Sequence, residues 1–114
     1  MSFFTLLPVW IAQAKSMGAS FTTDSIKMAW EDNFGIQMVW TGTPTGVIEV
    51  QVSMDPDNLG WETIPFSPSL TQPAGAAGTN WAEVNQTTAA YVRIKYTRTS
   101  GTGVFNAKIS AKSV

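Results

Sequence analysis

Residues 36–53 read IQMVWTGTPTGVIEVQVS, and this stretch decides the fold class. Apolar and other side chains alternate along it on both sides of a Thr/Gly/Pro turn at residues 41–46. The apolar members of the pattern are Ile36, Met38, Trp40, Ile48, Val50 and Val52. A period of two is typical of half-buried strands, and a short Gly-containing turn joins antiparallel neighbours. The stretch therefore predicts a β-hairpin with one face on a core.

A second stretch near the C-terminus repeats this pattern. Residues 92–110 read VRIKYTRTSGTGVFNAKIS, and one extra residue in the turn aligns the two segments. Trp40 then matches Tyr96, and Gly46 matches Gly103. Two interpretations stay open: the segments are copies of one hairpin design, or Thr-rich hairpins resemble each other by chance. If they are copies, related strands are expected on two different sheets.

Other parts of the chain show the same strand period. Shorter alternating runs occupy residues 26–30 and 61–64; a polar turn at residues 31–33 follows the first of them, and one at residues 55–58 precedes the second. Six or more antiparallel strands in about 90 residues predict an all-β protein, a two-layer β-sandwich or jelly roll. We expect one such domain at residues 21–114, preceded by an N-terminal arm at residues 1–20.

The N-terminal arm is strongly apolar. Its expected subunit-contact residues are Phe3, Phe4, Leu6, Leu7, Val9, Trp10 and Ile11. No basic segment precedes them as in a secretory signal, and the run is shorter than the roughly 20 residues of a membrane-spanning helix. A helix at residues 8–17 has only weak support, because no clean 3.6-residue period is present. We expect the arm to pack on its own domain or on a neighbouring copy; contact with a membrane surface is the less favoured alternative.

The composition argues against an enzyme. Cys and His are both absent, which removes thiol chemistry and the commonest general base and metal ligand. No nucleophile or phosphate-binding motif occurs, and the spacing of the eight acidic residues selects no catalytic pair. The net charge of −1 and a charged fraction of 13% disfavour nucleic-acid binding. We expect no cofactor and no catalytic residue.

A polar turn offers oxygen atoms that a calcium ion could accept. It contains Asp55, Asp57 and Asn58, but no Gly or distal Glu stands at the offsets of an EF-hand. A turn that ends a strand, with Pro56 restricting φ and Asp55 as its cap, is the favoured interpretation. No metal site is predicted.

Four residues are candidates for contact with a ligand or partner. Trp40 lies in phase with core residues, whereas Trp61 and Trp81 lie near turns and loops. Tyr91 and Arg93 share the outward face of their strand. Exposed Trp rings are common anchors at binding surfaces, and the irregular stretch at residues 65–79 is long enough to suggest a functional loop.

The order of two segments resembles that of a known class of proteins. A strand VQVS followed by Asp, a polar turn and Trp61, within TGVIEVQVSMDPDNLGWETI, is joined by YVRIKYTRTSGTGVFNAKIS near the C-terminus. Together they resemble small β-sandwich virion proteins of bacteriophages, and also discoidin-like sandwiches. The resemblance covers residues 25–112. It implies a structural role in the virion, as a capsid, decoration, spike or tail protein that contacts its own copies and other virion proteins. The alternative is a carbohydrate-binding module that recognises host glycans through Trp61, Trp81 and the loop at residues 65–79.

Overall fold

The computed structural model describes residues 5–28 and 31–112, with side chains from residue 8 onward. These residues form nine β-strands and no helix. The strands are β1 (Thr5–Ser16), β2 (Phe21–Thr22), β3 (Ile26–Lys27), β4 (Asn33–Gly42), β5 (Thr45–Ser53), β6 (Glu62–Thr63), β7 (Gly78–Val84), β8 (Tyr91–Ser100) and β9 (Gly103–Lys112).

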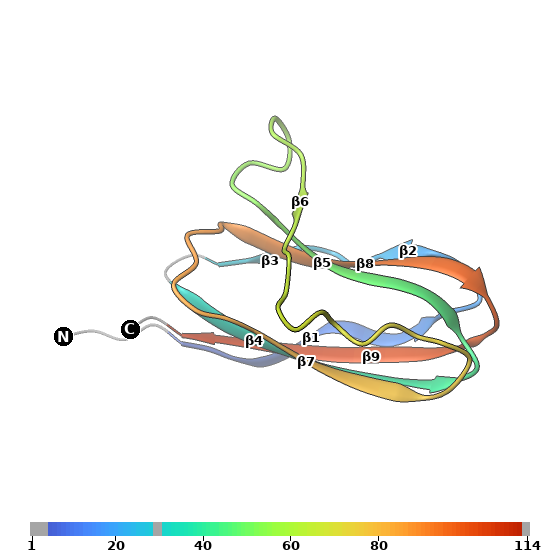
Figure 1. Cartoon of the computed structure of the whole chain (residues 1–114). Coiled ribbons are helices and arrows are strands. Elements are labelled where there is room, and N and C mark those ends of the chain that lie inside the picture. The colour runs from blue at the N-terminus through green and yellow to red at the C-terminus, as the bar shows by residue number, and fades with distance from the viewer. Residues whose placement is uncertain (1–4, 29–30, 113–114) are drawn as a thin grey trace.

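The strands form two antiparallel sheets that pack face to face (Figure 1). One sheet has four strands in the order β1-β9-β4-β7. The five-stranded sheet has the order β2-β8-β5-β6, with β3 also paired to β8. The alternating apolar residues of the central strands point between the sheets, where Trp40, Tyr96, Phe105 and Ile48 are buried. The predicted all-β sandwich is confirmed.

The two predicted hairpins are not hairpins. β4 and β5 follow each other in sequence but lie in different sheets, and the same is true of β8 and β9. Each turn therefore carries the chain across the sandwich, and β4 pairs with β9 while β5 pairs with β8. A short Thr/Gly turn suits both connections, because a crossing between sheets needs the same sharp bend as a hairpin.

The repeat in the sequence is a symmetry of the structure. Trp40 lies opposite Phe105, and their equivalents in the alignment, Tyr96 and Ile48, also lie opposite each other. The same correspondence relates Met38–Ala107 to Ile94–Val50, and Ile36–Ile109 to Val92–Val52. A chance likeness between hairpins would not reproduce the register of both sheets. Exchanging the two strand-turn-strand segments, β4–β5 and β8–β9 (the crossing units), therefore exchanges the pairing registers of the two sheets, and related strands lie on the two sheets as expected.

The symmetry extends to the outer strands. β1 borders β9 as β6 borders β5, and β7 borders β4 as β2 and β3 border β8. The chain is therefore two units of the same order, one ending with β5 and the other beginning with β6. Within residues 5–28 and 31–112, each strand pairing joins a strand of the first unit to a strand of the second.

The N-terminal segment is a strand of this sandwich, and the helix considered for residues 8–17 is wrong. β1 pairs with β9 through a ladder with three register shifts, and Ala14 has a positive φ of 50°. These irregularities place the neighbours Ile11 and Ala12 both in the core, which breaks the period of two that identifies a strand in sequence. The arm is therefore extended and packs on its own domain.

The segment between β6 and β7 crosses from one sheet to the other at the edge of the sandwich (Figure 1). The side-chain amide of Gln72 accepts a hydrogen bond from the Ile48 N–H and donates one to the Ile48 carbonyl at 3.1 Å. The amide of Asn80 in β7 makes the same pair of bonds with the Thr71 backbone, at 2.8 and 2.7 Å. Two side-chain amides thus complete backbone pairing that no strand provides, and the predicted long loop is a strap that closes one side of the sandwich.

Candidate functional site

The arm residues expected at a subunit contact have different environments. Phe3 and Phe4 lie outside the described residues, and Leu6 and Leu7 belong to β1 without a described side chain. Val9 packs against the core, and Ile11 is buried in it, so Ile11 is not available to a neighbouring copy. Trp10 points outward and is 45% exposed. Among the arm residues with described side chains, Trp10 is thus the large apolar one on the surface.

On the outer face of the five-stranded sheet, the structure brings Trp61 and Arg93 together. The guanidinium carbon of Arg93 lies 4.2 Å from the centre of the Trp61 ring, and its Nε donates to the Gln51 side chain at 2.9 Å. Burial lowers the pKa of Arg93 from its usual range. Trp61 is half-buried under this contact, and Tyr91 is half-buried at the start of the same strand as Arg93. Arg93 thus links Trp61 to Gln51 on this face.

The outer face of the four-stranded sheet carries a different row of side chains. Trp10 in β1 pairs with Lys108 in β9, Lys108 with Gln37 in β4, and Gln37 with Trp81 in β7. This tryptophan row (Trp10, Lys108, Gln37 and Trp81) crosses all four strands at one level. Trp81 is 63% exposed, and the Nζ of Lys108 lies 4.5 Å from the centre of the Trp10 ring. The structure therefore places two exposed indoles at opposite edges of one sheet.

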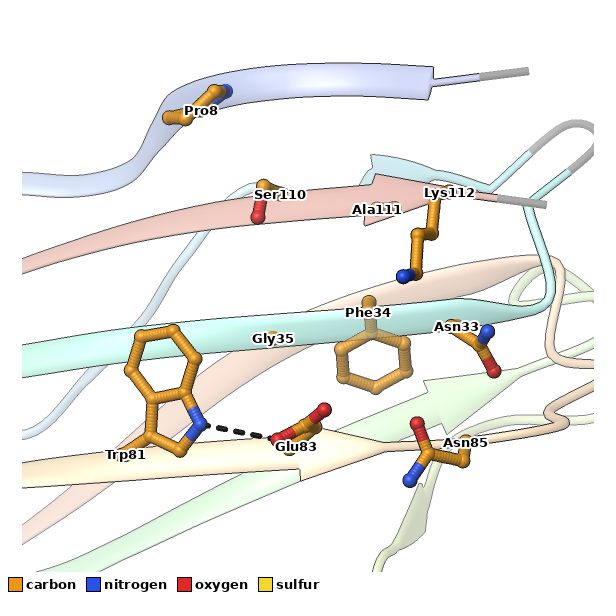
Figure 2. A pocket seen from close by; sticks show the side chains of 10 residues that line it. All are labelled: Pro8, Asn33, Phe34, Gly35, Trp81, Glu83, Asn85, Ser110, Ala111 and Lys112. Atoms are coloured by element: carbon orange, nitrogen blue, oxygen red, sulfur yellow. Dashed lines mark hydrogen bonds between the residues drawn. The ribbon is translucent and has the colours of Figure 1, made fainter. Parts of the chain in front are cut away.

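A shallow pocket lies beside the Trp81 end of this row (Figure 2). Its volume is about 450 Å³, and its lining includes Asn33 and Gly35 of β4, Glu83 of β7 and Lys112 of β9. Figure 2 shows the Trp81 indole reaching from β7 over Gly35, and a Cβ at Gly35 would approach the ring to 3.4 Å. The indole Nε1 donates to Glu83 at 3.3 Å. Because Gly35 has no side chain, the ring has room to lie against the sheet. The hydrogen bond links the ring to Glu83.

The Asp-rich turn between β5 and β6 uses its oxygen atoms internally. The Asp55 carboxylate accepts from the Asp57 N–H at 3.3 Å and from the Asn58 amide at 2.8 Å. This is the cap expected of a turn that ends a strand. Within residues 5–28 and 31–112, no cluster of three His, Cys, Asp or Glu side chains is arranged to hold a metal ion.

In the same part of the chain, no helix is long and apolar enough to cross a membrane.

The sequence analysis predicted a contact role for two of the four residues of the tryptophan row and not for the other two. Trp81 and Trp10 were both singled out, the first for a ligand and the second for a subunit contact. The missed residues are Lys108 and Gln37 of the row and Glu83 of the adjoining pocket. Their outward position follows from the strand period, but their alignment with two Trp residues depends on pairing registers between distant strands.

Comparison with known proteins finds a solved structure with a similar fold. No family model matches the chain, and no curated protein matches it either. The solved structure of the SPBc2 prophage-derived protein YomS is similar, with a TM-score of 0.64 over 99% of this chain and 96% of that one. The two sequences are 8% identical, so the likeness is one of fold.

Proposed function

We propose that this chain is a structural subunit of a bacteriophage particle that assembles through contacts with its own copies and with other virion proteins. The observation that carries the proposal is the fold shared with a prophage-derived protein over nearly the whole length of both chains. Such a subunit acts in the virion by occupying a position and binding its neighbours. The proposal gives the chain no catalytic role.

Side-chain contacts, rather than addition of a strand, are the proposed mode of assembly. β1 forms an edge of its sheet, and its irregular pairing with β9 and the presence of Pro8 make that edge a poor template for another strand. The first residue of β1 pairs with Lys112 near the end of β9. Phe3, Phe4, Leu6 and Leu7 are neighbours of this first residue in the sequence, and we assign the contact between copies to them.

A loop that stands out from the five-stranded sheet supplies a second contact region (Figure 1). It joins β5 to β6 and carries Met54 and Leu59, which are 60% and 73% exposed. The hydrogen bonds of Asp55 brace the loop, which lowers the entropic cost of ordering its apolar side chains on binding. We assign contacts with other virion proteins to this loop.

The mass of the protein in solution, measured by light scattering over a range of concentrations, tests the self-assembly. The full chain is expected to form an oligomer, and the double variant Phe3→Ser/Phe4→Ser is expected to be a folded monomer. Val47→Ser is the matched control, because Val47 is 45% exposed on the outer face of the five-stranded sheet, away from the arm. A full chain that stays monomeric at every concentration, or an oligomer that the double variant leaves intact, would contradict the proposed contact.

A further inference from the structure

The tryptophan row has a composition unlike that of a protein contact. Fully buried centres of protein interfaces are rich in aromatic residues and poor in Lys, while polar groups occupy the rim. Here the order is reversed: Lys108 and Gln37 lie in the middle, and Trp10 and Trp81 lie at the two ends. The ligand that fits this row must be polar along its middle and offer a flat apolar surface near each end.

Both indoles already make contacts with neighbouring residues of the sheet. Trp81 lies over Gly35 and donates to Glu83, and Trp10 contacts the ammonium group of Lys108. An aromatic ring that is already ordered loses little conformational entropy on binding. The exposed parts of the two rings are therefore preorganised for a ligand to stack on.

Hydrogen-bonding groups are available between and beside the rings. The side-chain amides of Gln37 and Asn85 make no hydrogen bond to the part of the chain that the structure describes, and both are exposed. Each amide can donate and accept. Together with the Glu83 carboxylate and the Lys112 ammonium group at the pocket, they form a mixed set of donors and acceptors. Such a set is suited to hydroxyl groups, which also donate and accept.

The charges on this face favour a neutral ligand. Lys108 lies against the Trp10 ring, and Glu83 accepts from the Trp81 indole, so one charge of each sign is already engaged within the site. The charged groups of the row and its pocket are Lys108, Lys112 and Glu83, an excess of one positive charge, which is far less than the basic surface that an anionic polymer needs. Charge complementarity thus disfavours nucleic acid and acidic glycans.

We propose that the outer face of the four-stranded sheet binds a neutral oligosaccharide laid across the strands along the tryptophan row. A pyranose ring has one face of C–H groups, which stacks on the negative face of an indole, and a rim of hydroxyl groups. Three strand spacings separate the Trp10 and Trp81 backbones, about 14 Å in total. A single sugar cannot reach both rings, so the site selects a chain of sugars over a monosaccharide.

The opposite sheet supplies an internal comparison. In the two-fold correspondence, Gln37 matches Arg93 and Lys108 matches Gln51. In that second cluster Arg93 stacks on Trp61 and its Nε donates to Gln51, and the cluster lies on the outer face of the other sheet, away from the tryptophan row. Loss of Trp61 is therefore expected to leave oligosaccharide binding unchanged, which makes it a matched control for the loss of Trp81.

Binding of the full-length chain to soluble neutral oligosaccharides tests the proposal. Cello-, chito-, malto-, xylo- and manno-oligosaccharides are titrated by calorimetry, with the matching monosaccharides and heparin for comparison. At least one neutral oligosaccharide is expected to bind, and its monosaccharide and heparin are not. Trp81→Ala and Trp10→Ala are each expected to weaken binding about tenfold or more. Gln37→Ala keeps both rings and is expected to weaken binding several-fold. Trp61→Ala is expected to have no effect.

Each variant is first checked for native thermal unfolding, and Gln37→Ala keeps the test decisive if a Trp variant does not fold. Absence of binding to every neutral oligosaccharide would overturn the proposal. So would binding that survives loss of both Trp10 and Trp81, or that falls equally with Trp61→Ala. If Trp81→Ala instead changes the mass of the protein in solution without any effect on sugar binding, the face is a contact between copies. The proposed glycan site is tested separately from assembly at the arm, since Phe3→Ser/Phe4→Ser changes no residue of the tryptophan row.

Discussion

Two glycines hold equivalent positions where the two crossing units meet. A Cβ on Gly46 would collide with the Thr97 carbonyl oxygen, and a Cβ on Gly103 would collide with that of Thr41. Gly46 matches Gly103 in the repeat, and Thr97 matches Thr41. The two-fold relation thus reaches individual atoms, and it explains why glycine stands at both positions.

Gly46→Ala and Gly103→Ala are each expected to destabilise the protein by about 1–3 kcal/mol, the usual range for extra atoms forced into a packed site. Both substitutions force a Cβ against a backbone carbonyl oxygen, and Gly46→Ala also brings it to 2.7 Å from the Tyr96 ring. Denaturant unfolding followed by tryptophan fluorescence measures the two losses. Gly18→Ala is the control, since a Cβ there finds ordinary contacts, the nearest at 3.4 Å from the Ser16 hydroxyl oxygen. A Gly46→Ala variant as stable as Gly18→Ala would show that the units do not pack this closely.

At the scale of elements, the strap between β6 and β7 depends on side-chain amides in place of a strand. Gln72 occupies both backbone hydrogen-bonding groups of Ile48 in β5. Beyond the two-residue strand β6, this amide protects part of the β5 edge. The strap is therefore a part of the sheet system rather than a loop free to move.

Gln72→Ala is expected to lower the free energy of unfolding by about 1–3 kcal/mol, because it leaves the Ile48 N–H and carbonyl without their partners. Amide hydrogen exchange should show the sharpest effect, with faster exchange at Ile48 and little change in β9. Gln13→Ala, at an exposed position of β1, is the matched control. Unchanged exchange at Ile48 would mean that water or another group replaces the amide without cost.

The elements that could be predicted from sequence are those with an undisturbed period of two. β4, β5, β8 and β9 were found in this way, because inward apolar and outward polar residues alternate along each. β1 was missed because its irregular pairing interrupts the period, and β7 because the inward Asn80 and Ala82 give no apolar signal. The sequence also did not predict that β4 and β5 lie in different sheets, because the residues of a turn do not determine which strands pair with each other.

At the scale of the whole molecule, the two units of the repeat are fully interleaved. All the strand pairings of the described chain join a strand at or before Ser53 to a strand at or after Glu62. Neither unit has a strand pair of its own, so neither can bury an apolar face alone. Pairing between distant segments also predicts slow folding, in the range of milliseconds to seconds, for a two-state β protein.

This interleaving predicts that the protein can be divided and rebuilt. Fragments 1–59 and 60–114, cut in the loop between β5 and β6, should each be unfolded alone, because each lacks every pairing partner of its strands. An equimolar mixture should recover the β-sheet circular dichroism of the intact chain and a cooperative thermal transition. The cut removes no backbone hydrogen bond of either sheet, as Leu59 and Gly60 lie outside the strands and are exposed. A fragment that is folded by itself would contradict the interleaved architecture, whereas a mixture that recovers only with both fragments would establish that the fold is made by the contact of its two halves.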